Sequence, residues 1–171
     1  MGTTLALMQQ GDLKQEAGES AAAAKLFDAA AVSAPNPIFG DLARLKAAQV
    51  LLDTAPFAQL QTRLVPLTDP KRPYSIYAKE ALAMAKLMAG KTTEARRDFN
   101  VLSLSLGAPD DMRQRCQLAV ALIDAGEAPS AVAAVKAAAT MPPPPALTLP
   151  PPSSGAQGPG GAPPPSTGAS P

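Results

Sequence analysis

A short set of residues recurs at fixed distances along the first 143 residues of the chain. Three glycines, Gly18, Gly90 and Gly126, are separated by 72 and 36 residues. After each glycine, a small residue follows at +5 and a bulky apolar residue at +9. An aliphatic residue stands at +12, and a residue that ends helices, proline or glycine, stands at +17. These residues are Ala23, Phe27, Ala30 and Pro35; Ala95, Phe99, Leu102 and Gly107; and Ala131, Val135, Ala138 and Pro143. A repeated spacing requires the same packing contacts in each copy, so the chain is predicted to be a stack of similar units.

A fourth, degraded copy is expected between the first two glycines. Leu60, Leu64 and Leu67 have the same spacing as the apolar residues of the other copies, one residue out of phase. The segment from Asp53 to Pro56 takes the place of the glycine turn. The sequence therefore predicts four units.

Each unit is expected to be a hairpin of two helices. Glycine tolerates the positive φ that follows a helix end, and the small residue five positions later allows the two helices to approach closely. The bulky residue at +9 then lies on the same helix face and fills the groove between them. Asn36 is predicted to cap a helix that has Pro37 at its first position. The expected helices are 3–17, 19–34, 37–52, 56–68, 74–89, 92–106, 110–125 and 128–140, which makes the chain an all-α superhelical array.

The last 30 residues have a different composition. Residues 142–171 contain 12 of the 20 prolines and no charged side chain, so they offer little to bury. We expect a repeat domain over residues 1–141 and a disordered Pro/Gly-rich tail over 142–171.

The residues at these offsets match the signature of tetratricopeptide repeats: a glycine turn, then alanine, a bulky apolar residue, alanine and proline. The unit here is 36 residues long and its first helices lack the large aromatic residue of that signature. The stretches ARLKAAQVLLDTAPFAQLQTRLVPL and YAKEALAMAKLMAGKTTEARRDF resemble the YfgM-like family, ancillary subunits of the SecYEG translocon. The resemblance covers about residues 5–138.

This resemblance implies a scaffold on the periplasmic side of the bacterial inner membrane that links Sec translocon components with periplasmic chaperones. Members of the family have an N-terminal transmembrane helix, so an anchor is expected to precede residue 1, and the chain as given is expected to be soluble. A cytoplasmic adaptor with one dedicated partner is the alternative.

In such arrays the first helices of successive units line a concave groove, where ligands bind. The family's groove positions, transferred to this chain, predict a protein-binding site. The methionines among them would form an adaptable apolar surface, although methionine at helical spacing is also typical of a buried core. The groove residues are Met8, Asp12, Tyr77, Glu80, Met84, Met88, Arg113, Cys116 and Val120.

The composition argues against catalysis. The chain has no histidine and one cysteine, so no His-based triad, metal site or cofactor site is expected. Gly90-Lys91-Thr92 imitates the end of a phosphate-binding loop, but Ala85 stands where that loop needs glycine. The adjacent acids Asp110 and Asp111 are interpreted as helix-start residues. An enzyme that uses carboxylates remains a remote alternative.

Two further expectations concern partners. A net charge of +1, with its basic residues dispersed, does not favour nucleic acid. The last hairpin is strongly apolar, so its outer face could pair with a second copy of the chain. Cys116, although a groove position, is interpreted as a buried apolar residue of that hairpin in preference to a reactive thiol.

Overall fold

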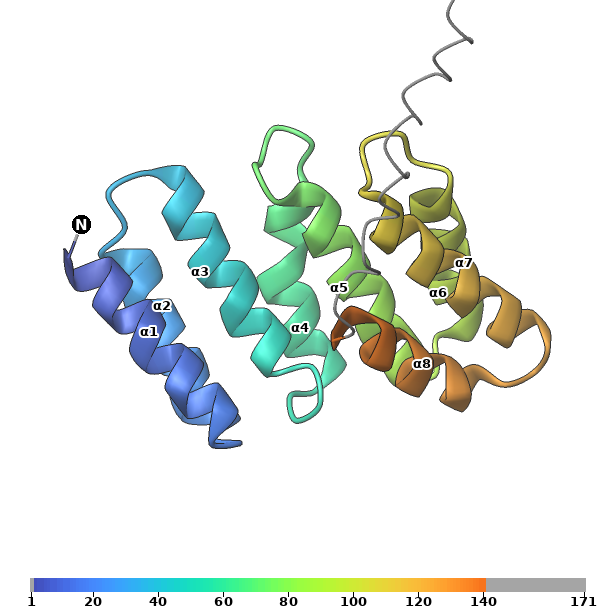
Figure 1. Cartoon of the computed structure of the whole chain (residues 1–171), viewed down its shortest axis with the longest axis horizontal. Coiled ribbons are helices and arrows are strands. Elements are labelled where there is room, and N and C mark those ends of the chain that lie inside the picture. Colours follow the sequence, from blue (N-terminus) through green and yellow to red (C-terminus); the bar gives the residue numbers. More distant parts are fainter. Residues whose placement is uncertain (1, 141–171) are drawn as a thin grey trace, which may run out of the picture. The chain divides into compact units, whose positions relative to one another are not determined.

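The computed structural model describes residues 2–140, which form one compact helical unit (Figure 1). Every regular element in this range is a helix, as predicted. The predicted disordered tail, residues 142–171, lies outside the described residues. The elements are α1 Gly2–Glu16, α2 Ser20–Val32, α3 Pro37–Val50, α4 Phe57–Leu64, the 3₁₀-helix η1 Val65–Thr68, α5 Ser75–Met88, α6 Thr92–Ser103, α7 Asp110–Asp124 and α8 Ala128–Thr140.

Three of the four hairpins turn at the predicted glycines. Gly18, Gly90 and Gly126 have φ values of 75°, 76° and 78°, the left-handed conformation that glycine adopts without strain. In each turn the glycine N–H donates to the carbonyl three residues back, and the next N–H donates to the carbonyl five residues back. This pair of hydrogen bonds satisfies the last carbonyl groups of the preceding helix. The glycine spacing thus correctly predicted three hairpin turns.

The second unit departs from the predicted helix over residues 56–68. Its second helix, α4, ends at Leu64 and continues as the single 3₁₀ turn η1. Pro66 explains the change, because proline has no N–H to donate and its ring clashes with the preceding helical turn. The α-helical part of this unit's second helix is therefore 8 residues long, against 13 in α2 and 12 in α6.

The bulky residues at +9 are fully buried, as the pattern predicted. Phe27 of α2 and Phe99 of α6 have no exposed surface. The Phe27 ring lies against Gly11 of α1, and Lys46 of α3 places its Nζ 5.2 Å from the ring centroid. Phe27 therefore fills the space between its own hairpin and the next one.

Equivalent helices of neighbouring units are joined by ion pairs at about one repeat length. Asp12 of α1 pairs with Lys46 of α3, 34 residues later. Glu80 of α5 pairs with Arg115 of α7, 35 residues later. Among the second helices, the guanidinium of Arg63 in α4 donates two hydrogen bonds to the carboxylate of Asp28 in α2, also at a separation of 35. Charged residues that pair with one another thus recur at about the same spacing as the apolar residues.

The helix α8 is placed differently from the other second helices, which each pack on the first helix of the next unit. It packs against α7 and also against α5, and in Figure 1 it crosses in front of one end of α5. Its Lys136 pairs with Asp53 in the turn between α3 and α4, 83 residues away in sequence. None of the helices in the described range combines the length and apolar character that a bilayer crossing requires.

Replacing Gly11 by alanine tests the close approach of α1 and α2. An added Cβ would lie 2.6 Å from a ring carbon of the buried Phe27, and such overpacking costs about 1–3 kcal/mol. The better helix propensity of alanine offsets about 1 kcal/mol of that cost. We expect Gly11→Ala to lower the free energy of unfolding, measured by urea denaturation.

The matched control is Gly40→Ala in α3. Its Cβ would lie 3.1 Å from Nη1 at the far end of the long Arg44 side chain, with no other atom closer than 3.5 Å. This variant is expected to be neutral or stabilised by up to about 1 kcal/mol. Equal effects of the two substitutions would contradict the close packing of Gly11 on Phe27.

Candidate functional site

In Figure 1 the first helices α1, α3, α5 and α7 follow one another along the array, and α8 packs against α5 and α7. We call the side of the first helices on which α8 packs the first-helix face. It carries three of the four predicted protein-binding residues of α5. Tyr77 is 39% exposed, whereas Met84 is 6% exposed and Glu80 is half-buried. These three residues line one cleft of about 210 Å³. The structure therefore brings together three of the four predicted residues of α5, whereas the fourth, Met88, packs on the core of the last two units.

Other residues of this cleft were not predicted. They come from α3 and the turn after it, from α5, from α7 and from α8, and they include apolar and charged groups. The positions missed are Gln49, Leu52, Ala81, Arg115, Val135, Lys136 and Ala139. The clearest available signal was the opposite charge of Glu80 and Arg115, one repeat length apart.

In α7 the prediction chose Arg113, but Arg115 is the arginine at the cleft. Arg115 donates hydrogen bonds from Nε and Nη2 to the Glu80 carboxylate at 2.9 and 3.1 Å. Arg113 instead pairs with Asp110 within its own helix. The difference of two residues turns the side chain by about half a helical turn.

The predicted residues of α1 do not join this cleft. Met8 is buried in a separate cluster with Ala30, Ala31 and Ala43. The carboxylate of Asp12 accepts a hydrogen bond from Lys46 at 2.5 Å, and the same ammonium lies near the Phe27 ring. Both residues therefore contribute to the packing of the first two units.

The remaining predicted positions belong to the core of the last two units. Met88 and Val120 are partly buried and pack on this core, and Cys116 is completely buried in it. Burial, together with the nearby charge of Glu80, raises the pKa of the Cys116 thiol to about 12. The thiol is therefore protonated at neutral pH, as expected for an apolar packing residue rather than a nucleophile.

The carboxylates near the cleft are held by arginine. Arg115 also donates to Asp111 at 2.9 Å, and this hydrogen bond holds the pKa of Asp111 below its ordinary value. Burial lowers the pKa of Arg115, but its bonds to Glu80 and Asp111 outweigh this effect and leave the pKa raised. Within residues 2–140 no three His, Cys, Asp or Glu side chains are grouped as metal ligands would be.

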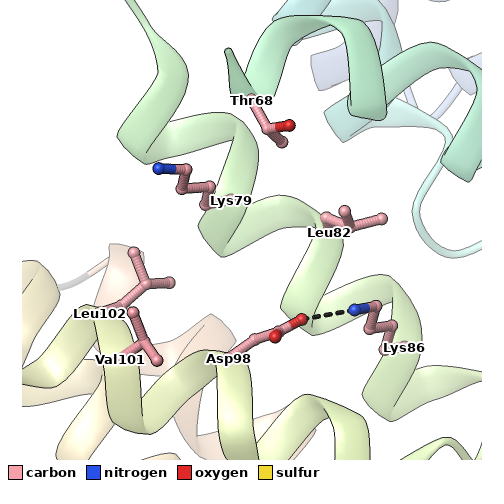
Figure 2. A pocket seen from close by; sticks show the side chains of 7 residues that line it. All are labelled: Thr68, Lys79, Leu82, Lys86, Asp98, Val101 and Leu102. Atoms are coloured by element: carbon pink, nitrogen blue, oxygen red, sulfur yellow. Dashed lines mark hydrogen bonds and ion pairs between the residues drawn. The ribbon is translucent and has the colours of Figure 1, made fainter. Parts of the chain in front are cut away.

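A second cleft lies on the opposite side of α5 (Figure 2). It has a volume of about 320 Å³ and is lined by Thr68 of η1 and by residues of α5 and α6. Lys86 of α5 donates to Asp98 of α6 at 2.6 Å, as the dashed line in Figure 2 shows. Lys79 forms no ion pair with any residue that the structure describes. The other lining residues are Leu82, Val101 and Leu102.

The short helix α4 places this cleft beside η1. Beyond Leu64 a single 3₁₀ turn, not an α-helix, runs toward α5, and Thr68 at its end lines the opening. No sequence pattern predicted this cleft. Pro66, inside a predicted helix, was the signal that the second unit would be irregular there.

Comparison of the chain with protein-family models, with curated proteins and with solved structures finds no match.

Proposed function

We propose that this chain is a protein-binding scaffold of the tetratricopeptide type, whose partners contact the first-helix face. The observation that carries the proposal is the repeat itself. The same glycine turn and buried +9 residue recur in three of the four hairpins, and ion pairs join equivalent helices 34 or 35 residues apart. Stacked hairpins of this kind bind proteins on the surface that their first helices share.

The chemistry of the face supports protein recognition. The cleft at α5 combines apolar groups, which include Leu52, Tyr77 and Met84, with the ion pair between Glu80 and Arg115. Apolar side chains bordered by a few polar groups are typical of protein-binding surfaces. Tyrosine and arginine are also enriched among the residues that contribute most to binding.

The finer proposal concerns location and partners. The resemblance of residues 5–138 to the YfgM-like family supports an adaptor on the periplasmic side of the bacterial inner membrane. Its partners would be Sec translocon components and periplasmic chaperones. The cytoplasmic adaptor with a dedicated partner would use the same first-helix face, so identifying the bound proteins separates the two proposals.

Site-specific photo-crosslinking in cells that naturally contain the protein tests both the scaffold function and the identity of its partners. A photoreactive phenylalanine analogue at Tyr77 is expected to capture partner proteins, because this side chain is exposed beside the cleft. The matched control is the same residue at Gln61, an exposed position on the second helix α4. Capture at neither position, or of the same proteins at both, would contradict the scaffold proposal. Capture of partners that include no translocon or chaperone component would contradict the finer one.

A further inference from the structure

The last helix covers part of the proposed binding surface. Val135, Lys136 and Ala139 of α8 line the same cleft as Tyr77 and Met84 of α5. The ion pair between Lys136 and Asp53 holds α8 against the turn that ends α3. A helix of the chain itself therefore lies where the proposed function places a partner.

The helix α8 buries fewer side chains than the second helices α2 and α6 do. Its position +9 carries Val135, where α2 and α6 carry buried phenylalanines. Over residues 128–139, Ala131 and Val135 are the only buried side chains of α8. The free energy of apolar burial scales with the area removed from water. Burial therefore stabilises the packing of α8 less than that of α2 or α6.

The fit of α8 is also incomplete. The cleft of about 210 Å³ remains beside Val135 and Ala139, and its apolar lining comes from Leu52, Tyr77 and Met84. Valine and alanine are too short to fill this space. A helix with larger side chains at the same two positions would bury more apolar surface on the same face.

The charge next to the cleft favours a basic helix. Lys136 is paired with Asp53, whose side chain is 64% exposed. Glu80, the other acidic group at the cleft, is already held by two hydrogen bonds from Arg115. Asp53 is therefore the carboxylate that an incoming cation would pair with once α8 leaves.

We propose that α8 is a displaceable occupant of the first-helix face, and that this face receives an amphipathic helix from a partner protein. That helix carries two large apolar side chains four residues apart, at the places of Val135 and Ala139, and a basic residue at the place of Lys136. The inference rests on the proposed scaffold function and specifies the class of partner. Displacement costs little because α8 is weakly attached, and the larger side chains favour the incoming helix.

The first test is a peptide titration against the purified full chain, read by fluorescence anisotropy. The probe is a labelled peptide of residues 126–140 that carries Val135→Leu and Ala139→Leu. The matched control peptide carries Ser130→Leu and Ala133→Leu, on positions that are exposed in α8. We expect the probe to bind tighter than the control by about tenfold or more, since each added methylene in an apolar pocket contributes about that factor. Equal binding of the two peptides would overturn the inference.

Variants of the chain test displacement. Lys136→Glu places a carboxylate against Asp53 and should loosen α8, so the probe should bind this chain tighter than the original chain. Val135→Leu with Ala139→Leu in the chain should fill the cleft from within and weaken binding of the probe by about tenfold or more. Unchanged affinity in both variants would show that α8 and the peptide do not compete.

Charge reversal tests recognition by Asp53. In the chain with Asp53→Lys, α8 is loosened equally for every probe, so a probe that also carries Lys136→Glu should bind this chain tighter than the original probe does. A second copy of the chain is the other possible occupant. Concentration-dependent doubling of mass by light scattering, suppressed by the cleft-filling variant, would overturn the proposal of a partner helix.

The two proposals fail in different ways. If the probe binds none of the chains while the photoreactive residue at Tyr77 still captures proteins, the inference about α8 is wrong and the scaffold function stands. If the probe binds and competes with α8 while Tyr77 captures nothing in cells, the scaffold function is wrong.

Discussion

Replacing Phe27 by alanine is expected to lower the free energy of unfolding by about 3–5 kcal/mol. The ring is completely buried between Gly11 of α1 and Lys46 of α3, so its removal leaves a cavity at the joint of the first two units. Rigid helices on both sides limit collapse into that cavity. Urea denaturation followed by far-ultraviolet circular dichroism measures the loss.

Two control substitutions bound this result. Phe27→Leu retains most of the apolar volume and should cost less than Phe27→Ala. Val32→Ala, at the end of the same helix, removes a side chain that is 88% exposed and should change stability by no more than about 0.5 kcal/mol. If Phe27→Ala cost no more than Val32→Ala, the position at +9 would not be the packing residue of the hairpin.

The second large effect is expected at Asp41, the buried acid of α3. Its carboxylate accepts hydrogen bonds from Arg72 at 2.8 and 3.1 Å and from Arg44 at 3.1 Å. Removing both cations by Arg44→Ala and Arg72→Ala leaves a buried charge without a partner, which costs about 3–5 kcal/mol. The same urea denaturation measures this loss.

A third substitution tests whether the loss of stability comes from the unpaired charge of Asp41. Adding Asp41→Ala to the double variant removes the unpaired charge, so the triple variant should be more stable than the double variant. Arg44→Ala alone should cost less than about 1 kcal/mol, because that side chain is 48% exposed and Arg72 remains. A triple variant less stable than the double variant would mean that packing, not charge, is what Asp41 contributes.

The helices could be predicted because their ends are local events. Glycine after a helix, asparagine before Pro37 and two acids at the start of α7 act within one turn of the backbone. Asn36 indeed accepts a hydrogen bond from the Phe39 N–H, and Asp110 and Asp111 lie in the first turn of α7. The error in the predicted helix 56–68 had a local cause too, since Pro66 ends the regular helix.

The candidate site was less predictable because it is made by contacts between distant residues. Tyr77, Glu80 and Met84 lie together on one face of α5, and their helical spacing was sufficient to group them. Arg115, Leu52 and Lys136 come from three other segments. Predicting them requires the rotation of each helix about its own axis, which interhelical packing sets.

What the sequence determined by itself is the series of hairpins, because each hairpin depends on a glycine turn and on small and bulky residues a few positions away. Tertiary structure alone decided where the last helix lies. The turn at Gly126 has nearly the same φ and the same hydrogen bonds as those at Gly18 and Gly90. Yet α2 and α6 pack forward on the first helix of the next unit, whereas α8 packs back on α5, the first helix of the preceding unit. A turn sets the reversal of the chain, whereas the face that a helix covers depends on the apolar surface that distant helices leave open to it.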